Sequence, residues 1–280
     1  MTNAKIFCMC LDEHHLDNLK KLKYLPVGLG SKNFSHSWLR DNTGNNISEK
    51  NAYYGEYTFY YWVWKNELKN KPQDTWFGFT GYRYHWSQEN NLKSEQITKF
   101  VNKENFENFI LKKIPKEWDN YDCILGEPIF VNKWKFSKIF KHAKKKFFLN
   151  PSNFLKKNQN IKLHFDVFHG EGNIDKAIDC LQENEKNDFK NFILQNNSFN
   201  RENLFFCKSK YLMERYFESV FTWLDKCEKI FKFDLEGYSQ KRMYAFLAER
   251  YLSYWFNKYS KPLEWPIFFF DTNKNKVLIK

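Results

Sequence analysis

The chain has 280 residues, of which 42% are hydrophobic and 20% aromatic, with 10 Gly and 7 Pro. This apolar content is enough for a sizeable core and excludes a globally disordered chain. The formal net charge of +12 favours an anionic partner, which is nucleic acid, an acidic membrane surface or a phosphate-bearing substrate.

The six cysteines form no C-x-x-C pair, which argues against a zinc ribbon and a thioredoxin-like motif. Most lie in apolar runs, so we interpret them as reduced, buried hydrophobes in a cytoplasmic protein. The first residues lack the pattern of a signal peptide, and no stretch of about 18 uncharged apolar residues predicts a membrane span. His14 and His15 have no third metal ligand nearby and are predicted to lie at the surface.

Apolar runs bounded by turn-forming residues predict the β-strands. The predicted strands are residues 5–11, 76–82, 121–125 and 203–207, and residues 25–30 are predicted to be a strand end or a turn. Residues 267–270 and 277–279 are predicted to pair as a terminal hairpin.

Helical spacing of apolar residues predicts the helices. They are residues 105–114, 133–148, 174–194, 211–231, 239–257 and one that starts at Ser48, with Ser48 as its N-cap and Ala52, Tyr53, Tyr60, Val63 and Trp64 facing inward. Glu56 lies on that inward stripe, so the helix lines a polar cavity or Glu56 has a cationic partner. Helices alternating with strands predict an α/β sheet with covered faces.

Several common site signatures are missing from the chain, including G-x-G-x-x-G, the P-loop, H-E-x-x-H and G-x-S-x-G. No D-x-D occurs either, although many nucleotide-sugar enzymes use that motif to hold a metal. A bound diphosphate would therefore be met by Lys, Arg, helix N-termini or carboxylates scattered in the sequence.

Four segments in order resemble one known family. They are D-N-T-G-x-N-I-S-x-K-N-x-x-Y-x-E at residues 41–56 with Y-W-V-W-K-N at 61–66, GFTGYRYHW at 78–86, an asparagine-containing strand with an aromatic helix at 203–216, and RMYAFLAERYL at 242–252. Together they resemble a bacterial capsule and O-antigen family, formerly a domain of unknown function and now associated with galactofuranosyltransferases. The chain departs from the family pattern at Gly81, Tyr84 and Ala245.

The resemblance implies a GT-A-like fold, in which a Rossmann-type sheet binds a nucleoside diphosphate sugar at the carboxyl ends of its strands. It implies one glycosyltransferase domain over residues 1–280, with a nucleotide-sugar-binding half (1–130) and a more helical acceptor-side half (131–280). The residues assigned to the donor are Val27, Gly28, Asp41, Asn42, Thr43, Asn46, Lys50, Asn51, Glu56, Arg83 and Arg250.

Among these donor residues, Asp41 and Asn42 are expected to bond the base or ribose, and Lys50 the phosphate oxygens. Arg83 follows a buried strand at the place where GT-A enzymes commonly carry D-x-D, so its guanidinium would neutralise the diphosphate without a metal. The alternative role for Arg83 is an ion pair with Glu56. If a metal such as Mn²⁺ or Mg²⁺ is used after all, Asp122 or Asp166 would be its ligands.

The first candidate for the general base is Glu249, which shares one face of its predicted helix with Arg242 and Phe246. Its alternative role is an internal salt bridge to Arg242 or Arg250.

The competing base candidates are Asp166, His169 and Glu171. Gly170 and Gly172 predict an exposed loop position for His169, whereas His164 is predicted to be packed.

The resemblance therefore implies an inverting transferase that moves galactofuranose from UDP to a glycan or lipid-linked glycan in surface polysaccharide synthesis. Arg83, Lys50 and Arg250 would stabilise the departing diphosphate, and no metal cofactor is expected. The basic surface would hold a cytoplasmic enzyme against the anionic inner face of the membrane. A nucleic-acid-binding protein and a non-catalytic sugar-binding relative are the alternatives, but no nucleic-acid motif is present and the aromatics fall on predicted buried faces.

Overall fold

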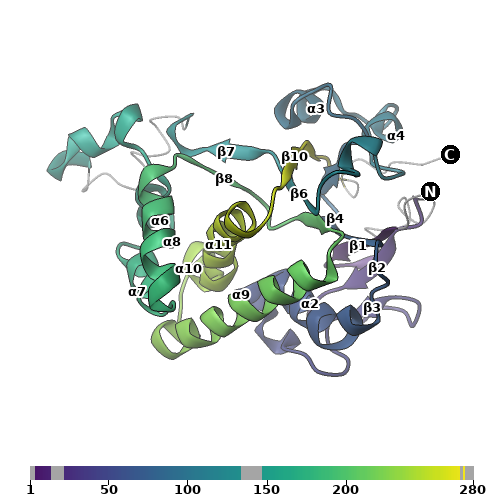
Figure 1. The fold of residues 1–280 in the computed structure, drawn as a ribbon, viewed down its shortest axis with the longest axis horizontal. Coiled ribbons are helices and arrows are strands. Elements are labelled where there is room, and N and C mark those ends of the chain that lie inside the picture. The colour runs from purple at the N-terminus through teal and green to yellow at the C-terminus, as the bar shows by residue number, and fades with distance from the viewer. Residues whose placement is uncertain (1–3, 14–21, 134–146, 272–273, 275–280) are drawn as a thin grey trace.

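A computed structural model of the chain describes residues 4–13, 22–133, 147–271 and 274 (Figure 1). The strands are β1 (Ala4–Cys10), β2 (Leu25–Gly28), β3 (Leu39–Arg40), β4 (Trp76–Gly81), β5 (Tyr84–Trp86), β6 (Cys123–Gly126), β7 (Pro128–Phe130), β8 (Ser198–Asn200), β9 (Phe205–Cys207), β10 (Leu263–Trp265) and β11 (Ile267–Phe269). The helices are α1 (Asn51–Tyr54), α2 (Tyr57–Trp62), α3 (Ser94–Phe100), α4 (Phe106–Phe109), α6 (Ile161–His169), α7 (Asn173–Asp179), α8 (Glu183–Gln195), α9 (Lys210–Phe231), α10 (Tyr238–Lys241) and α11 (Met243–Tyr259).

Seven strands form one central sheet in the order β10-β6-β9-β4-β1-β2-β3. The pairs β1–β2, β1–β4, β2–β3 and β6–β10 are parallel, whereas β9 runs antiparallel to both of its neighbours. The predicted α/β architecture is confirmed, and the four predicted internal strands correspond to β1, β4, β6 and β9. The segment predicted to be a strand end or a turn at residues 25–30 contains β2. Strands from the later half of the chain, β9 and β10, lie in the same sheet as β1 to β4 (Figure 1).

Aromatic side chains cover both faces of this sheet. On one face Phe79 of β4 packs against Tyr60 of α2, with ring centroids 4.5 Å apart, and Phe205 of β9 packs against Tyr216 of α9. On the other face Phe206 of β9 contacts Trp118 at 4.9 Å. Alternation along β9 therefore buries neighbouring Phe residues in opposite layers, as the two-residue period of a strand requires.

The helix predicted to start at Ser48 is interrupted. A 3₁₀ turn (Ser48–Lys50) leads into α1, and Gly55, with φ of +56°, separates α1 from α2. Ser48 makes no side-chain cap. The predicted inward stripe is wrong in part, because the break changes the phase of the helix and leaves Ala52 exposed while Tyr57 is fully buried.

Three other predicted helices were too long. Residues 174–194 form α7 and α8, and residues 239–257 form α10 and α11 with Arg242 between them. Residues 105–114 contain only the short α4, after which Ile110 leaves the helix and pairs with Ser87. At Ile110, pairing with a distant segment therefore competes with local helix formation.

The prediction that residues 267–270 pair with residues 277–279 is also wrong. Residues Ile267–Phe269 pair with Tyr84–Trp86 of β5 in an antiparallel two-stranded sheet, and residues 277–279 lie outside the described part of the chain. His14, His15 and most of the predicted helix at 133–148 lie outside it as well. Within the described ranges, no helix combines the length and apolar character that a membrane span requires.

Candidate active site

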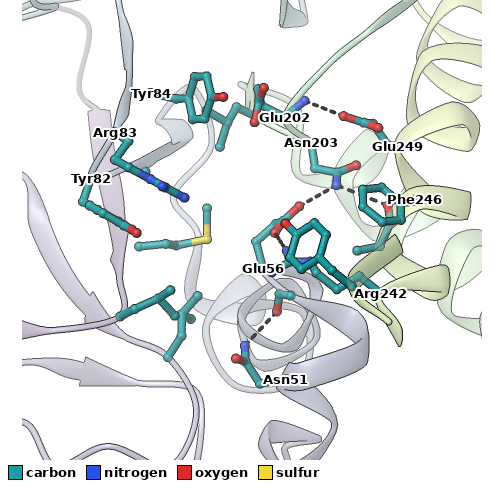
Figure 2. A pocket seen from close by; sticks show the side chains of 18 residues that line it. Asn51, Glu56, Tyr82, Arg83, Tyr84, Glu202, Asn203, Arg242, Phe246 and Glu249 are labelled. Carbon is teal, nitrogen blue, oxygen red and sulfur yellow. Dashed lines mark hydrogen bonds and ion pairs between the residues drawn. The ribbon is translucent and has the colours of Figure 1, made fainter. Parts of the chain in front are cut away.

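A cavity of about 200 Å³ opens at the carboxyl edge of the parallel strands β2, β1 and β4 (Figure 2). This edge is where α/β sheets commonly bind ligands. The cavity is lined by Met9, Leu11, Leu29, Asn51, Gly55, Glu56, Gly81, Tyr82, Arg83, Tyr84, Glu202, Asn203, Leu204, Tyr238, Arg242, Ala245, Phe246 and Glu249. Both halves of the chain contribute to it.

Glu56 and Arg242 form an ion pair on one wall of the cavity. Nη2 of Arg242 lies 3.2 Å from Oε2 of Glu56, and Nδ2 of Asn203 donates to Oε1 of Glu56 over 2.5 Å. Both expectations for Glu56 are thus met, since it lines a polar cavity and has a cationic partner. Arg242 Nε is buried and has no hydrogen-bond partner among the described residues, so it retains one N–H for a ligand.

Glu202 and Asn203 form a left-handed turn beside the cavity, in the connection from β8 to β9. Their φ angles are +70° and +56°, a region that non-glycine residues rarely adopt. The turn is fixed from outside, because the Glu202 N–H donates to Oε1 of Glu249 over 2.8 Å and the Tyr60 hydroxyl donates to the Asn203 carbonyl over 2.8 Å. Consecutive strained residues of this kind cluster at functional sites.

Glu249 is also tied to the fully buried Arg250. Nη1 of Arg250 lies 2.6 Å from Oε2 of Glu249, and Nη2 contacts Nδ1 of His164 at 3.2 Å and Nε2 of His169 at 3.4 Å. Nδ1 of His169 faces the Ser239 carbonyl at 3.1 Å, so it carries the proton and leaves Nε2 to accept from Arg250. Burial and the adjacent guanidinium lower the pKa of His169 to about 3, which keeps this imidazole neutral.

Two carboxylates at the cavity have raised pKa values. Burial and the neighbouring Glu249 raise the pKa of Glu202 to about 7, against the opposing effects of Arg201 and Tyr84. Burial also raises the pKa of Glu249, and Arg250 opposes this rise. Of these two carboxylates, Glu202 is therefore the one that can hold or release a proton near neutral pH.

Arg83 lies on the opposite side of the cavity. It follows β4, is exposed, and extends its guanidinium toward the cavity, where it lies 4.9 Å from the ring of Tyr82 (Figure 2). Among the described residues it makes no ion pair, so the alternative role of pairing with Glu56 is wrong. The guanidinium is available to an anion.

The chain matches the family model described as a domain of unknown function (DUF4422) over residues 5–261. It belongs to this family. No curated protein matches the chain. The solved apo structure of the bifunctional glycosyltransferase WbbM is similar over 95% of the chain, with a TM-score of 0.59 and 22% identity. The chain spans 45% of that chain's length, and the likeness shows that the two share a fold. The association of the family with galactofuranosyl transfer stays a prediction.

Of the residues predicted for the site, Asn51, Glu56, Arg83 and Glu249 line the cavity. The predicted grouping of Arg242, Phe246 and Glu249 is confirmed by the cavity lining, although Arg242 lies directly before α11 and not within it. The predicted salt bridge of Glu249 with Arg250 is confirmed as well.

Other predicted donor residues lie beside the cavity and not in it. Asp41 is fully buried, and its carboxylate accepts from the Gly30 N–H and the Thr58 hydroxyl, so direct contact with a base or ribose is ruled out by burial. Lys50 pairs with Glu228 at 2.7 Å, which commits its charge internally. Arg250 is 1% exposed and reaches the site only through Glu249.

The remaining donor candidates lie in the protein interior or in a surface turn, and none lines the cavity. Val27 is fully buried, and Gly28 lies under the ring of Phe34. Asn42, Thr43 and Asn46 belong to a surface turn outside the cavity, in which Asn46 Oδ1 accepts from the N–H and hydroxyl of Ser48.

The exposed loop predicted for His169 is wrong. His169 ends helix α6 and is 5% exposed, because Gly170 and Gly172, with φ of +98° and +71°, lie beyond the helix end and not around an open loop. His169 stacks on Phe246 with centroids 4.0 Å apart, so it supports the cavity wall from behind. Asp166, another predicted base, pairs with Lys162 at 2.6 Å outside the cavity, and Glu171 is exposed and outside it too.

Sequence reasoning missed Glu202 and the tyrosines at 82, 84 and 238 as lining residues. Glu202 lies in a short R-E-N segment that matches no catalytic motif, and its position is set by contacts with Glu249, which is 47 residues away in the sequence. Within the described ranges, no group of three or more His, Cys, Asp or Glu side chains could hold a metal ion. Independence from metal stays a prediction.

Proposed function

We propose that this protein is a glycosyltransferase that moves a sugar from a nucleoside diphosphate donor to a glycan acceptor. The observation that carries the proposal is the opposed charge of the cavity: Arg83 on one wall, and Glu202 with Glu249 on the other. Transfer of a sugar with inversion places the acceptor and the departing diphosphate on opposite sides of the anomeric carbon, where a carboxylate can accept the acceptor proton and a cation can stabilise the diphosphate. The fold shared with a glycosyltransferase supports the same assignment.

The donor is proposed to lie along the carboxyl ends of β1 and β4. The exposed guanidinium of Arg83 would contact the diphosphate, and the unpaired Nε–H of Arg242 would donate to a donor oxygen. A cavity of about 200 Å³ suits the transferred sugar more than a whole nucleotide, because sites for larger ligands span roughly 300–1,000 Å³. The nucleoside would extend outward from it.

The finer assignment is transfer of galactofuranose from UDP with inversion and without a metal, in surface polysaccharide synthesis. It rests on the motif resemblance and on the lack of a D-x-D. The net charge of +12 supports work at the anionic inner face of a membrane, close to a lipid-linked acceptor.

The test is a screen of nucleotide sugars that measures released nucleoside diphosphate in the presence of glycan acceptors. We expect turnover with a UDP-sugar, and thermal stabilisation by UDP but not by a single-stranded oligonucleotide. Stabilisation without turnover by any donor would favour a non-catalytic sugar-binding relative. Salt-sensitive oligonucleotide binding with no response to UDP would refute the proposal in favour of nucleic-acid binding.

A further inference from the structure

We propose that Glu202 is the catalytic base that accepts the acceptor's hydroxyl proton, and that Glu249 is a positioning residue that holds Glu202 in place. This inference rests on the proposed glycosyltransferase function and deepens it. It reverses the sequence-based hypothesis, which gave the role of base to Glu249.

Both carboxylate oxygens of Glu249 are already committed. Oε1 accepts from the Glu202 N–H over 2.8 Å (Figure 2). Oε2 pairs with Nη1 of Arg250 at 2.6 Å. Arg250 is fully buried, so protonation of Glu249 would leave the Arg250 guanidinium without an anionic partner. Glu249 is therefore suited to stay ionised and to hold a backbone, and poorly suited to take up a proton.

The turn that carries Glu202 is held by contacts with several elements. Asn203 Nδ2 donates to Glu56 over 2.5 Å and to the Ala245 carbonyl over 3.3 Å, and the Tyr60 hydroxyl donates to the Asn203 carbonyl. These bonds stabilise two successive residues in the left-handed region, at a cost that an unconstrained loop would avoid. The result is a carboxylate on a fixed backbone at the cavity wall.

The groups that face Glu202 suit proton transfer. Tyr84 of β5, Arg201 of its own segment, Glu249 of α11 and Glu56 at the start of α2 all act on its charge, and together with burial they give it a pKa of about 7. A general base works best when its pKa lies near the working pH. The Tyr84 pKa is raised to about 12 by burial, so its hydroxyl stays protonated and can orient the Glu202 carboxylate.

A second cavity lies next to the segment that carries Glu202, and we propose that it admits the acceptor. Arg201 lines this cavity of about 620 Å³ with Phe130 and Lys99, and its guanidinium lies 5.9 Å from the ring of Tyr84, which lines the first cavity. Glu202 lines the first cavity and its neighbour Arg201 lines the second, so the acceptor is placed on the Arg201 side of Glu202.

The proposed step is a single displacement. The acceptor hydroxyl oxygen forms a bond to the anomeric carbon while its proton moves to a carboxylate oxygen of Glu202. The bond from the anomeric carbon to the diphosphate oxygen breaks, and the nucleoside diphosphate leaves with the electron pair beside Arg83. Glu202 later returns the proton to water.

The test compares Glu202→Gln with Glu249→Gln in the donor assay across pH 5–9. We expect Glu202→Gln to lower kcat by about 10²–10⁴-fold with the donor KM changed by less than about threefold, and to abolish the acid limb of the kcat/KM profile. Glu202→Asp should keep that limb. Glu249→Gln should keep it too, since its amide oxygen still accepts from the Glu202 N–H.

Each variant must first be shown to fold, because Glu249→Gln leaves Arg250 without a counterion. Thermal stabilisation of the variant by UDP is the measure of folding. If both variants lose activity, the pH profile of the residual Glu249→Gln activity decides, and loss of its acid limb overturns the proposal. An active Glu202→Gln enzyme with a normal acid limb overturns it as well. A wild-type protein that turns over no donor contradicts the proposed function instead, so the two failures are distinguishable.

Discussion

Replacing Glu202 by Gln should make the protein more stable at alkaline pH, by an amount that the pKa of Glu202 sets. The pKa rises from 4.5 to about 7 on folding, mainly through burial and next through repulsion from Glu249. At 1.36 kcal/mol for each pKa unit, ionisation of Glu202 costs the folded state about 3 kcal/mol. Gln has the same shape without the charge and removes this cost.

The direction in which this stability difference changes with pH follows from proton linkage. A carboxyl whose folded pKa lies above its unfolded pKa costs nothing below about pH 4.5, and its cost grows between pH 4.5 and 7 and is complete above pH 7. The stabilisation by Gln should therefore be absent near pH 4.5 and full at pH 8. At roughly 2 °C for each kcal/mol in a domain of this size, the melting temperature should rise by about 4–6 °C at pH 8.

Differential scanning fluorimetry or circular dichroism at pH 4.5, 6 and 8 measures this difference. Glu117→Gln, at an exposed position, is the matched control and should show no such pH dependence. A Glu202→Gln protein that melts at or below the wild-type temperature at pH 8 would refute the reasoning, because Glu202 would then stabilise the fold through its charge. Higher stability with lower activity is the combination expected of a group retained for function.

Three further outcomes test the donor side of the site. Arg83→Ala should lower turnover by about 100-fold and change the free energy of unfolding by less than about 0.5 kcal/mol in a denaturation titration, because Arg83 is exposed and unpaired among the described residues; a large loss of stability would make Arg83 structural. Gly55→Ala should reduce turnover at least tenfold, because its Cβ would overlap Nη2 of Arg242. Gly237→Ala, which is also at a positive φ outside the αL region but in open space, should keep the activity; equal effects would show that backbone strain alone is responsible. Activity measured with excess EDTA should equal that without it, and restoration by Mn²⁺ of a lost activity would contradict the metal-free hypothesis.

The strands could be predicted because each is a short apolar run with a local signal. Residues 76–81 and 205–207, for example, are almost uniformly buried in the structure. Their order could not be predicted, since it depends on long-range pairing: β9 lies between β4 and β6 and antiparallel to both. The same limit explains the hairpin error, because Ile267–Phe269 finds its partner at Tyr84–Trp86 and not in the next segment of the chain.

Glycine explains two of the errors in the helical regions. Gly55 interrupts a sequence with continuous helical periodicity, and a positive φ is not visible from apolar spacing. Gly170 and Gly172 suggested a loop around His169, whereas Asn160 caps the start of α6 by accepting from the Leu163 N–H and the glycines follow its end. A glycine marks a change of backbone direction, but the sequence alone does not say on which side of the helix end a neighbouring side chain lies.

The sequence-based hypothesis depended on the segment at residues 41–51, yet its Asp41 is buried and supports the site from outside the cavity. The Asp41 carboxylate links the Gly30 N–H to the Thr58 hydroxyl, and Asn51 Nδ2 donates both to Thr58 Oγ1 over 3.1 Å and to the Gly55 carbonyl over 2.9 Å. This chain of bonds joins the end of β2 to the break between α1 and α2, directly before Glu56. A motif can therefore mark a site indirectly, because this one builds the turn that presents Glu56 to the cavity. Glu202 belongs to no motif, because contacts with residues distant in the sequence hold it in place.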